Sequence, residues 1–233
     1  NNHFDYKLIS YIADSFDNFD KDINCRCIVL CSEGKHFCAG ANFGKDRDMQ
    51  DKADPYSDLY SQAVRLFKNK KPVIAAVQGG AIGGGLGLSL VADFRIGCPE
   101  SRFSANFSRL GFHQGFGTTV TLPRVIGPQN AAMMMLTGRR LKGKEAFDIG
   151  LIDYLVPLKE VRSKAIELAE EISEAGPLAV QSIRATIRAG LAEQVEEIVA
   201  WELSEQVRLQ STKDFKEGIK ASLERRKPKF EGY

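Results

Sequence analysis

The sequence has few of the features that mark a metal, nucleic-acid or membrane protein. Its 233 residues carry a formal net charge of +2, so charge gives no general argument for a nucleic-acid partner. Its five cysteines have no second cluster to complete a zinc site. Free thiols in a reducing compartment are expected instead, and with them a cytoplasmic location. The uncharged run of residues 72–91 contains too much glycine for a membrane span, so no membrane partner is expected.

Two common phosphate-binding motifs are also absent. A dinucleotide fingerprint needs G-x-G-x-x-G between a strand and a helix, and the glycines of residues 79–87 do not have that spacing. Residues 138–144 match the G-x-x-x-x-G-K part of a P-loop. However, Glu145 follows where a hydroxyl residue is required, and no strand pattern precedes the match. This match is therefore interpreted as chance.

What the sequence does have is a high density of glycine after an apolar strand pattern. Residues 71–77 are typical of a buried strand, and six glycines follow within positions 79–87. A helix that begins with glycines presents backbone N–H groups without internal partners, and no Cβ atoms keep a ligand away. Such a terminus suits an anion, or a carbonyl oxygen that becomes anionic in a transition state. Close packing of the helix on the strand remains the alternative interpretation.

Strand and helix patterns alternate through the first half of the chain, which predicts an α/β protein with a largely parallel sheet. From residue 117 the pattern becomes mostly helical, and Ser211 is expected to cap the last helix. The predicted strands are residues 27–30, 73–77, 94–97 and 101–104, and the predicted helices are residues 4–19, 59–67, 84–91, 118–125, 129–136, 160–175, 178–189, 191–209 and 214–225.

Several motifs along the chain occur together and in one order. Because of these motifs, the chain resembles the enoyl-CoA hydratase/isomerase (crotonase) family over nearly its whole length. The motifs are His-Phe-Cys-Ala-Gly-Ala-Asn at 36–42, Lys-Pro-Val-Ile-Ala-Ala-Val-Gln-Gly at 71–79, Gly-Gly-Gly at 83–85 with Ala-Asp at 92–93, Leu-Pro-Arg-Val-Ile-Gly at 122–127, Leu-Thr-Gly-Arg at 136–139, Glu-Ala at 145–146 with Gly-Leu-Ile-Asp at 150–153, and Phe-Lys-Glu-Gly-Ile at 215–219.

The resemblance implies a crotonase-like ββα spiral (the ClpP/crotonase fold) over residues 1–175. It implies a C-terminal helical layer used for trimerisation over residues 176–233, and often a dimer of trimers. The family's usual opening strand pair has no counterpart in this sequence. The implied ligand is an acyl-CoA thioester, which is the substrate, and no covalently bound cofactor is expected.

The resemblance also implies where that thioester binds. In the family's common chemistry two backbone N–H groups hold the thioester oxygen and stabilise an enolate-like oxyanion. By motif position these donors are Ala41 and Gly84. Asn42 stands where the family often has aspartate. The residues expected to line the coenzyme A ester are Ala39, Ala41, Asn42, Phe43, Gly83 and Gly84.

This chain departs from the family pattern at the positions that transfer protons. The two glutamates of the hydratases correspond to Gly87 and Phe107, and the aspartate nucleophile of related dehalogenases corresponds to Gly115. Neither glycine nor phenylalanine can transfer a proton. His113 is the remaining candidate for a catalytic base, with a structural loop histidine as the alternative interpretation.

Three hypotheses about function follow from this pattern. The first is an acyl-CoA-processing enzyme, a hydratase or isomerase of fatty acid metabolism, in which Ala41 and Gly84 stabilise a thioester enolate. The second is a divergent crotonase-fold hydrolase that uses His113. The third is a non-catalytic acyl-CoA-binding protein. The retained oxyanion motif favours the first two, whereas the missing glutamates favour the last two over ordinary hydration.

Overall fold

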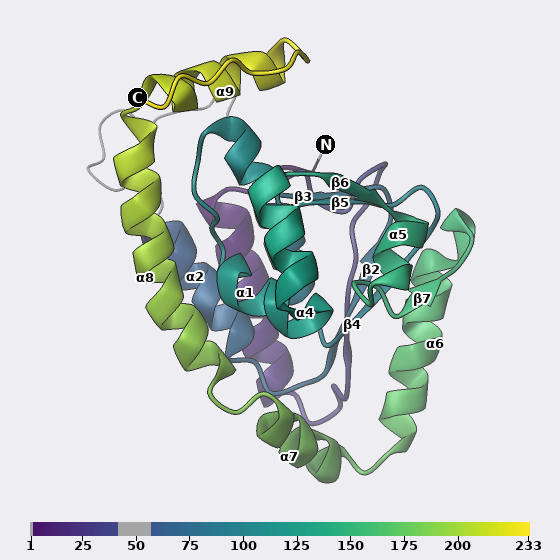
Figure 1. The fold of residues 1–233 in the computed structure, drawn as a ribbon. Helices are drawn as coiled ribbons and strands as arrows, with labels where there is room; N and C mark the ends of the chain where they lie inside the picture. Colours follow the sequence, from purple (N-terminus) through teal and green to yellow (C-terminus); the bar gives the residue numbers. More distant parts are fainter. Residues whose placement is uncertain (1, 42–56) are drawn as a thin grey trace.

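The computed structural model describes residues 2–41 and 57–233. Two small sheets lie at the centre, and helices surround them (Figure 1). The first sheet is parallel with strand order β1-β2-β4-β7, and the second has the order β3-β5-β6 with an antiparallel β5–β6 pair. The strands are β1 (Ile28–Leu30), β2 (Val73–Val77), β3 (Gly80–Ile82), β4 (Phe94–Gly97), β5 (Arg102–Ser104), β6 (Arg140–Lys142) and β7 (Tyr154–Leu155).

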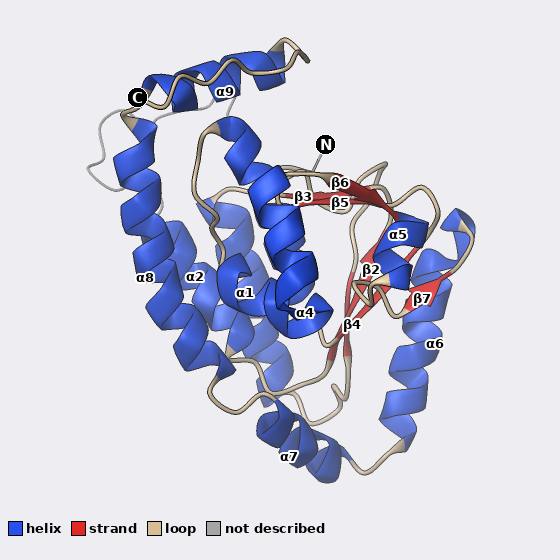
Figure 2. Ribbon diagram, in the orientation of Figure 1, coloured by secondary structure: helices blue, strands red, loops and turns tan. Residues whose placement is uncertain are grey.

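Helices make up most of the described chain, and Figure 2 shows how they enclose the two sheets. The long helix α8 lies along one side of the molecule and α6 along the opposite side (Figure 2). The helices are α1 (Tyr6–Lys21), α2 (Ser57–Phe67), α3 (Gly84–Leu90), η1 (Asn106–Leu110), α4 (Thr118–Thr137), α5 (Gly143–Asp148), η2 (Leu158–Glu160), α6 (Val161–Glu174), α7 (Pro177–Ile187), α8 (Leu191–Gln210) and α9 (Lys213–Leu223).

Strand β2 forms the centre of the hydrophobic core because both of its faces are covered. All five of its residues are buried, as expected for a strand in a parallel sheet with a layer on each side. Ile74 and Ala76 belong to a core cluster with residues of α6. Val73, Ala75 and Val77 alternate with them and belong to the main core on the opposite face.

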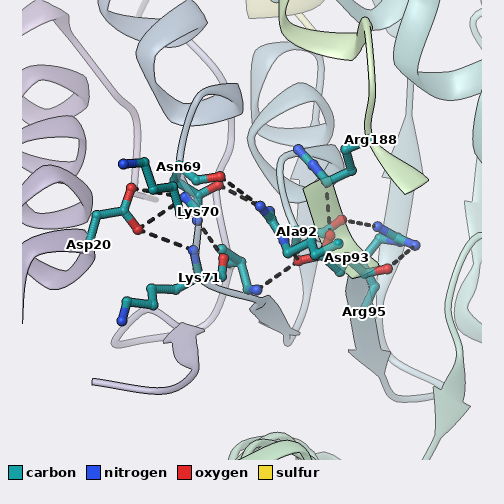
Figure 3. A network of polar contacts seen from close by, with 10 residues as sticks. Asp20, Asn69, Lys70, Lys71, Ala92, Asp93, Arg95 and Arg188 are labelled. Carbon is teal, nitrogen blue, oxygen red and sulfur yellow. Dashed lines mark hydrogen bonds and ion pairs between the residues drawn. The ribbon is translucent and has the colours of Figure 1, made fainter. Parts of the chain in front are cut away.

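Helix α7 is attached to this core mainly by charged side chains. Arg184 is the one buried residue of the helix. Its Nε donates to Asp93 Oδ2 at 2.8 Å, and Arg188 Nη1 donates to Asp93 Oδ1 at 3.1 Å (Figure 3). The same Asp93 carboxylate accepts the Val73 backbone N–H at 2.8 Å. Asp93 therefore joins the first residue of β2 to the C-terminal end of α7.

Most predicted elements are confirmed, with informative exceptions. The predicted break at Gly127-Pro128 is confirmed, because the two helical parts of α4 meet at a kink where Gly127 has φ of 77°. Ser211 is not the cap of the last helix, because Thr212 accepts the Phe215 N–H at 3.1 Å. Strands β3, β6 and β7 and helix α5 were not predicted. The proposed division at residues 175 and 176 stays a prediction.

Two further expectations concern metals and membranes. Within residues 2–41 and 57–233, no group of three or more His, Cys, Asp or Glu side chains is placed to hold a metal ion. None of the described helices combines the length and the apolar character needed to cross a bilayer.

Candidate functional site

The glycine run turns the chain from one sheet into the other and then starts α3. Residues 38–41 lie beside this run, because Cys38 donates its N–H to the Gly80 carbonyl and accepts the Ile82 N–H. A Cβ atom added to Gly40 would lie 2.7 Å from the Ile82 carbonyl oxygen and 3.6 Å from the Gly84 nitrogen. The segment that ends at Ala41 and the start of α3 are therefore packed backbone against backbone.

Glycine is required at the start of α3 for both conformation and packing. Gly83 has φ of 56°, in the region that favours glycine. A side chain on Gly84 would overlap the Phe4 ring, and one on Gly85 would overlap the Cys38 carbonyl. The packing interpretation of the glycines is thus correct for Gly85, and it does not exclude a binding role for Gly84.

Two backbone donors in this region have no acceptor among the described residues. Within the described residues, neither the Ala41 N–H nor the Gly84 N–H donates a hydrogen bond to another group. For Gly84 this follows from its place at the first position of a helix, where the N–H has no intrahelical acceptor. Two such donors can bind one oxygen atom that carries negative charge.

A cavity of about 320 Å³ opens beside these residues. Four of the residues predicted from the sequence, Ala39, Ala41, Gly83 and Gly84, line it together. Most of its other lining residues are apolar. They come from segments along the whole described chain, and they are Phe4, Gly40, Leu59, Tyr60, Ile82, Phe107, Leu110, Phe112, Phe116, Ile219 and Leu223, together with the polar His3, Asn106, Arg140, Gln206 and Ser222.

Comparison with known proteins identifies the family to which this architecture belongs. The family model described as enoyl-CoA hydratase/isomerase matches residues 1–233. The chain belongs to the enoyl-CoA hydratase/isomerase family. The Mycobacterium tuberculosis protein named enoyl-CoA hydratase EchA19 is 34% identical to it over 233 residues, a match that covers 97% of this chain and 86% of that protein.

Further relatives of this family agree with the fold. The crotonyl-CoA hydratase of Syntrophomonas wolfei is 32% identical, and the match covers 94% of this chain and 85% of that protein. The crystal structure of an enoyl-CoA hydratase/isomerase from Pseudoalteromonas atlantica superimposes with a TM-score of 0.87 at 25% identity, covering 98% of this chain and 91% of that chain. The chain therefore has the crotonase-like α/β fold that its motifs imply.

Four phenylalanines, Phe4, Phe107, Phe112 and Phe116, form what we call the aromatic wall of the cavity. Each is less than a tenth exposed. The rings of Phe4 and Phe116 have centroids 5.6 Å apart at a tilt of 51°, and those of Phe107 and Phe112 are stacked 6.4 Å apart. Aromatic pairs at these separations are mutually favourable.

The aromatic wall includes or adjoins the two positions, Gly87 and Phe107, that were predicted from the sequence to replace glutamates. A Cβ atom added to Gly87 would lie 2.7 Å from Phe116 Cβ, so the Phe116 ring fills the space of a side chain there. Phe107, at the other position, is itself part of the wall. Among the described residues that line the cavity, the ionisable side chains are those of His3, Tyr60 and Arg140.

The loop that ends at Phe116 is held by α8. Gln206 Nε2 donates to the carbonyl oxygens of His113 and Gln114 at 3.1 and 3.0 Å, and Gln206 Oε1 accepts the Tyr60 hydroxyl at 2.8 Å. A side chain on Gly115, the position of the dehalogenase nucleophile, would overlap the Tyr60 hydroxyl. Phe116 itself has φ of 63°, which is unusual for a residue other than glycine.

One turn further towards the N-terminus of α8, Glu202 fixes the other end of the same loop. Its carboxylate accepts the Gly117 N–H at 2.8 Å, the Thr119 N–H at 3.1 Å and the Thr119 hydroxyl at 2.6 Å. Glu202 is fully buried, and burial raises the pKa of its carboxyl group. It thereby satisfies donors at the N-terminus of α4.

The structure does not bring His113 into the cavity. Its imidazole Nδ1 lies 3.0 Å from the Gln114 carbonyl oxygen, and the side chain is half-buried but not among the lining residues. His3 lines the cavity instead, with Nδ1 3.3 Å from the Gly40 carbonyl oxygen. Asn42 and Phe43, which were predicted to contact the ligand, lie outside the described residues.

Sequence reasoning also missed a structural role for His36. Its Nδ1 accepts the Gly80 N–H at 3.0 Å, which requires that nitrogen to be unprotonated, and burial lowers the pKa of the ring. His36 therefore helps to fix the glycine run. No local motif marks the residues that hold the cavity wall, Tyr60 and Gln206, because they come from distant segments of the chain.

Proposed function

We propose that this protein is an acyl-CoA-processing enzyme in which the N–H groups of Ala41 and Gly84 hold the thioester oxygen and stabilise an enolate. The observation that carries the proposal is that these two donors, which have no acceptor in the part of the chain that the structure describes, lie at one cavity. Fixed amide donors cost no reorganisation when negative charge develops on the oxygen. The names of the relatives, which are hydratases of enoyl-CoA and crotonyl-CoA, support an acyl-CoA thioester as substrate. We propose that the enzyme has no covalently bound cofactor.

We propose further that Gly87 and Phe107 replace the two glutamates of the hydratases, so that hydration by paired carboxylates is not the main reaction. The apolar surroundings of both positions support this view. A non-catalytic acyl-CoA-binding protein is the second candidate function, and the scarcity of ionisable lining residues favours it. A hydrolase that uses His113 has less support, because His113 does not line the cavity.

A pair of substitutions at one position tests the oxyanion role. Both Gly84→Ala and Gly84→Pro add a Cβ atom beside Phe4, but only proline also removes the N–H. Binding of acetyl-CoA and turnover of a panel of acyl-CoA esters, crotonyl-CoA among them, are measured for both variants. We expect the proline variant to lose about 100-fold more activity than the alanine variant. Equal activities would contradict the oxyanion role, and binding without turnover by the wild type would favour the binding protein.

We also propose that the protein acts in the cytoplasm as a trimer or a dimer of trimers. Self-association is supported by α7, whose Leu178, Ile183 and Ile187 side chains are 82%, 59% and 66% exposed. Apolar side chains gathered on one helix are typical of surfaces that contact another protein.

A further inference from the structure

The cavity beside Ala41 and Gly84 is lined by the four phenylalanines of the aromatic wall. A cavity of this size does not need aromatic side chains in order to exclude water. Its volume of about 320 Å³ is in the range of small-molecule sites. Aliphatic side chains would exclude water equally well, and Leu59, Leu110 and Ile219 do so elsewhere in the lining. The four rings of the aromatic wall instead present flat faces and edges at fixed positions.

Phe116 is the member of the wall whose position is most strongly determined. Its side chain is 1% exposed, and its backbone is held at a positive φ between the Gln206 and Glu202 contacts. Its Cβ faces Gly87, one helical turn after Gly84. The ring therefore lies close to the part of an acyl group that is next to a thioester bound at Gly84.

We propose that the aromatic wall selects acyl-CoA esters whose acyl group carries an aromatic ring, and that Phe116 is a specificity-determining residue for this choice. The inference rests on the proposed function, since it places the thioester at Ala41 and Gly84. Offset or edge-to-face contacts between rings add to the effect of buried area, and a saturated ring of the same size cannot make them. An aromatic acyl group would contact Phe116 and Phe107 in this way.

Two matched ligands test the proposal by calorimetric titration. 3-Phenylpropanoyl-CoA and 3-cyclohexylpropanoyl-CoA have the same carbon skeleton, and neither has a C2–C3 double bond to hydrate. We expect the phenyl compound to bind about fivefold more tightly, which is the effect of one favourable ring contact. Acetyl-CoA, which has no ring, gives the baseline for binding of the coenzyme and thioester.

Variants of the aromatic wall assign the preference to its residues. Phe116→Leu is expected to reduce the difference between the two ring compounds to less than twofold, with the Kd of acetyl-CoA measured for each variant as its own reference. Phe107→Leu, in a backbone without positive φ, gives a second test if Phe116→Leu does not fold. Phe16→Leu changes a buried phenylalanine of α1 outside the cavity and should keep the full preference.

The outcomes separate this inference from the proposed function. Equal binding of the two ring compounds by the wild type would overturn the inference, as would a preference that persists in the Phe116→Leu and Phe107→Leu variants. Failure of all three CoA esters to bind would instead overturn the proposed function, and the inference with it.

Discussion

At the scale of single residues, Phe116 occupies the space in which a side chain at position 87 would lie. We predict that Gly87→Glu alone destabilises the fold by about 3 kcal/mol or more, because its side chain collides with Phe116 and places a carboxyl group among phenylalanines. The double variant Gly87→Glu with Phe116→Gly should recover part of this loss, since glycine both makes room and suits the positive φ.

Urea unfolding of the two variants measures that difference, and Phe116→Gly alone is the control for the cavity left by the ring. If Gly87→Glu is as stable as the wild type, Phe116 does not fill the space beside Gly87 as described. Crotonyl-CoA hydration by the double variant would further indicate that position 87 is within reach of the acyl group.

A second prediction at the residue scale concerns Glu202 and pH. Burial raises the pKa of its carboxyl group above the unfolded value of about 4.3, so the folded state holds the proton more tightly. This contribution to stability is fully present below that unfolded pKa and is lost as pH rises towards the folded pKa. Glu202→Gln should therefore show a smaller fall in unfolding free energy over this window than the wild type. Parallel pH profiles for the two proteins would contradict the raised pKa.

At the scale of elements, α7 depends on one carboxylate. Asp93→Asn leaves Arg184 and Arg188 with no carboxylate partner in a site where Arg184 is 8% exposed. Breaking such a buried pair costs about 3–5 kcal/mol. We expect the loss to appear first as faster amide hydrogen exchange in residues 177–187, while β2 keeps its protection apart from Val73. Glu33→Gln, which removes an exposed pair with Arg162, is the control and should change stability far less than Asp93→Asn.

The elements also show what a sequence can and cannot predict. The long amphipathic helices α1 and α8 and the strand β2 were predicted because their apolar periodicity is local. Strand β3 was missed, since three residues within a glycine run become a strand only through pairing with Arg102–Ser104. Similarly, motifs singled out Ala41 and Gly84, which line one cavity, and their role as oxyanion donors stays a prediction. The contact of Phe116 with Gly87 depends on a loop held from α8 and has no local signal.

At the scale of the whole molecule, the polar attachment of α7 leaves its apolar side chains without partners in the described chain. Leu178 and Ile187 are 82% and 66% exposed although their helix is well formed. Burial of each such side chain in a contact between copies contributes about 1.5–3 kcal/mol. We therefore predict that the wild type sediments as a trimer or larger, and that Leu178→Glu with Ile187→Glu shifts the mass towards the monomer.

Analytical ultracentrifugation at several protein concentrations measures this shift, with circular dichroism to show that the helices remain folded. Ser163→Glu adds the same kind of charge to an exposed position on α6 and should leave the association unchanged. All of the described lining residues of the cavity belong to one chain. A monomeric variant should therefore still bind acetyl-CoA. If the monomeric variant is folded but no longer binds acetyl-CoA, a second copy completes the site. Separating the copies would then remove part of the ligand's contacts.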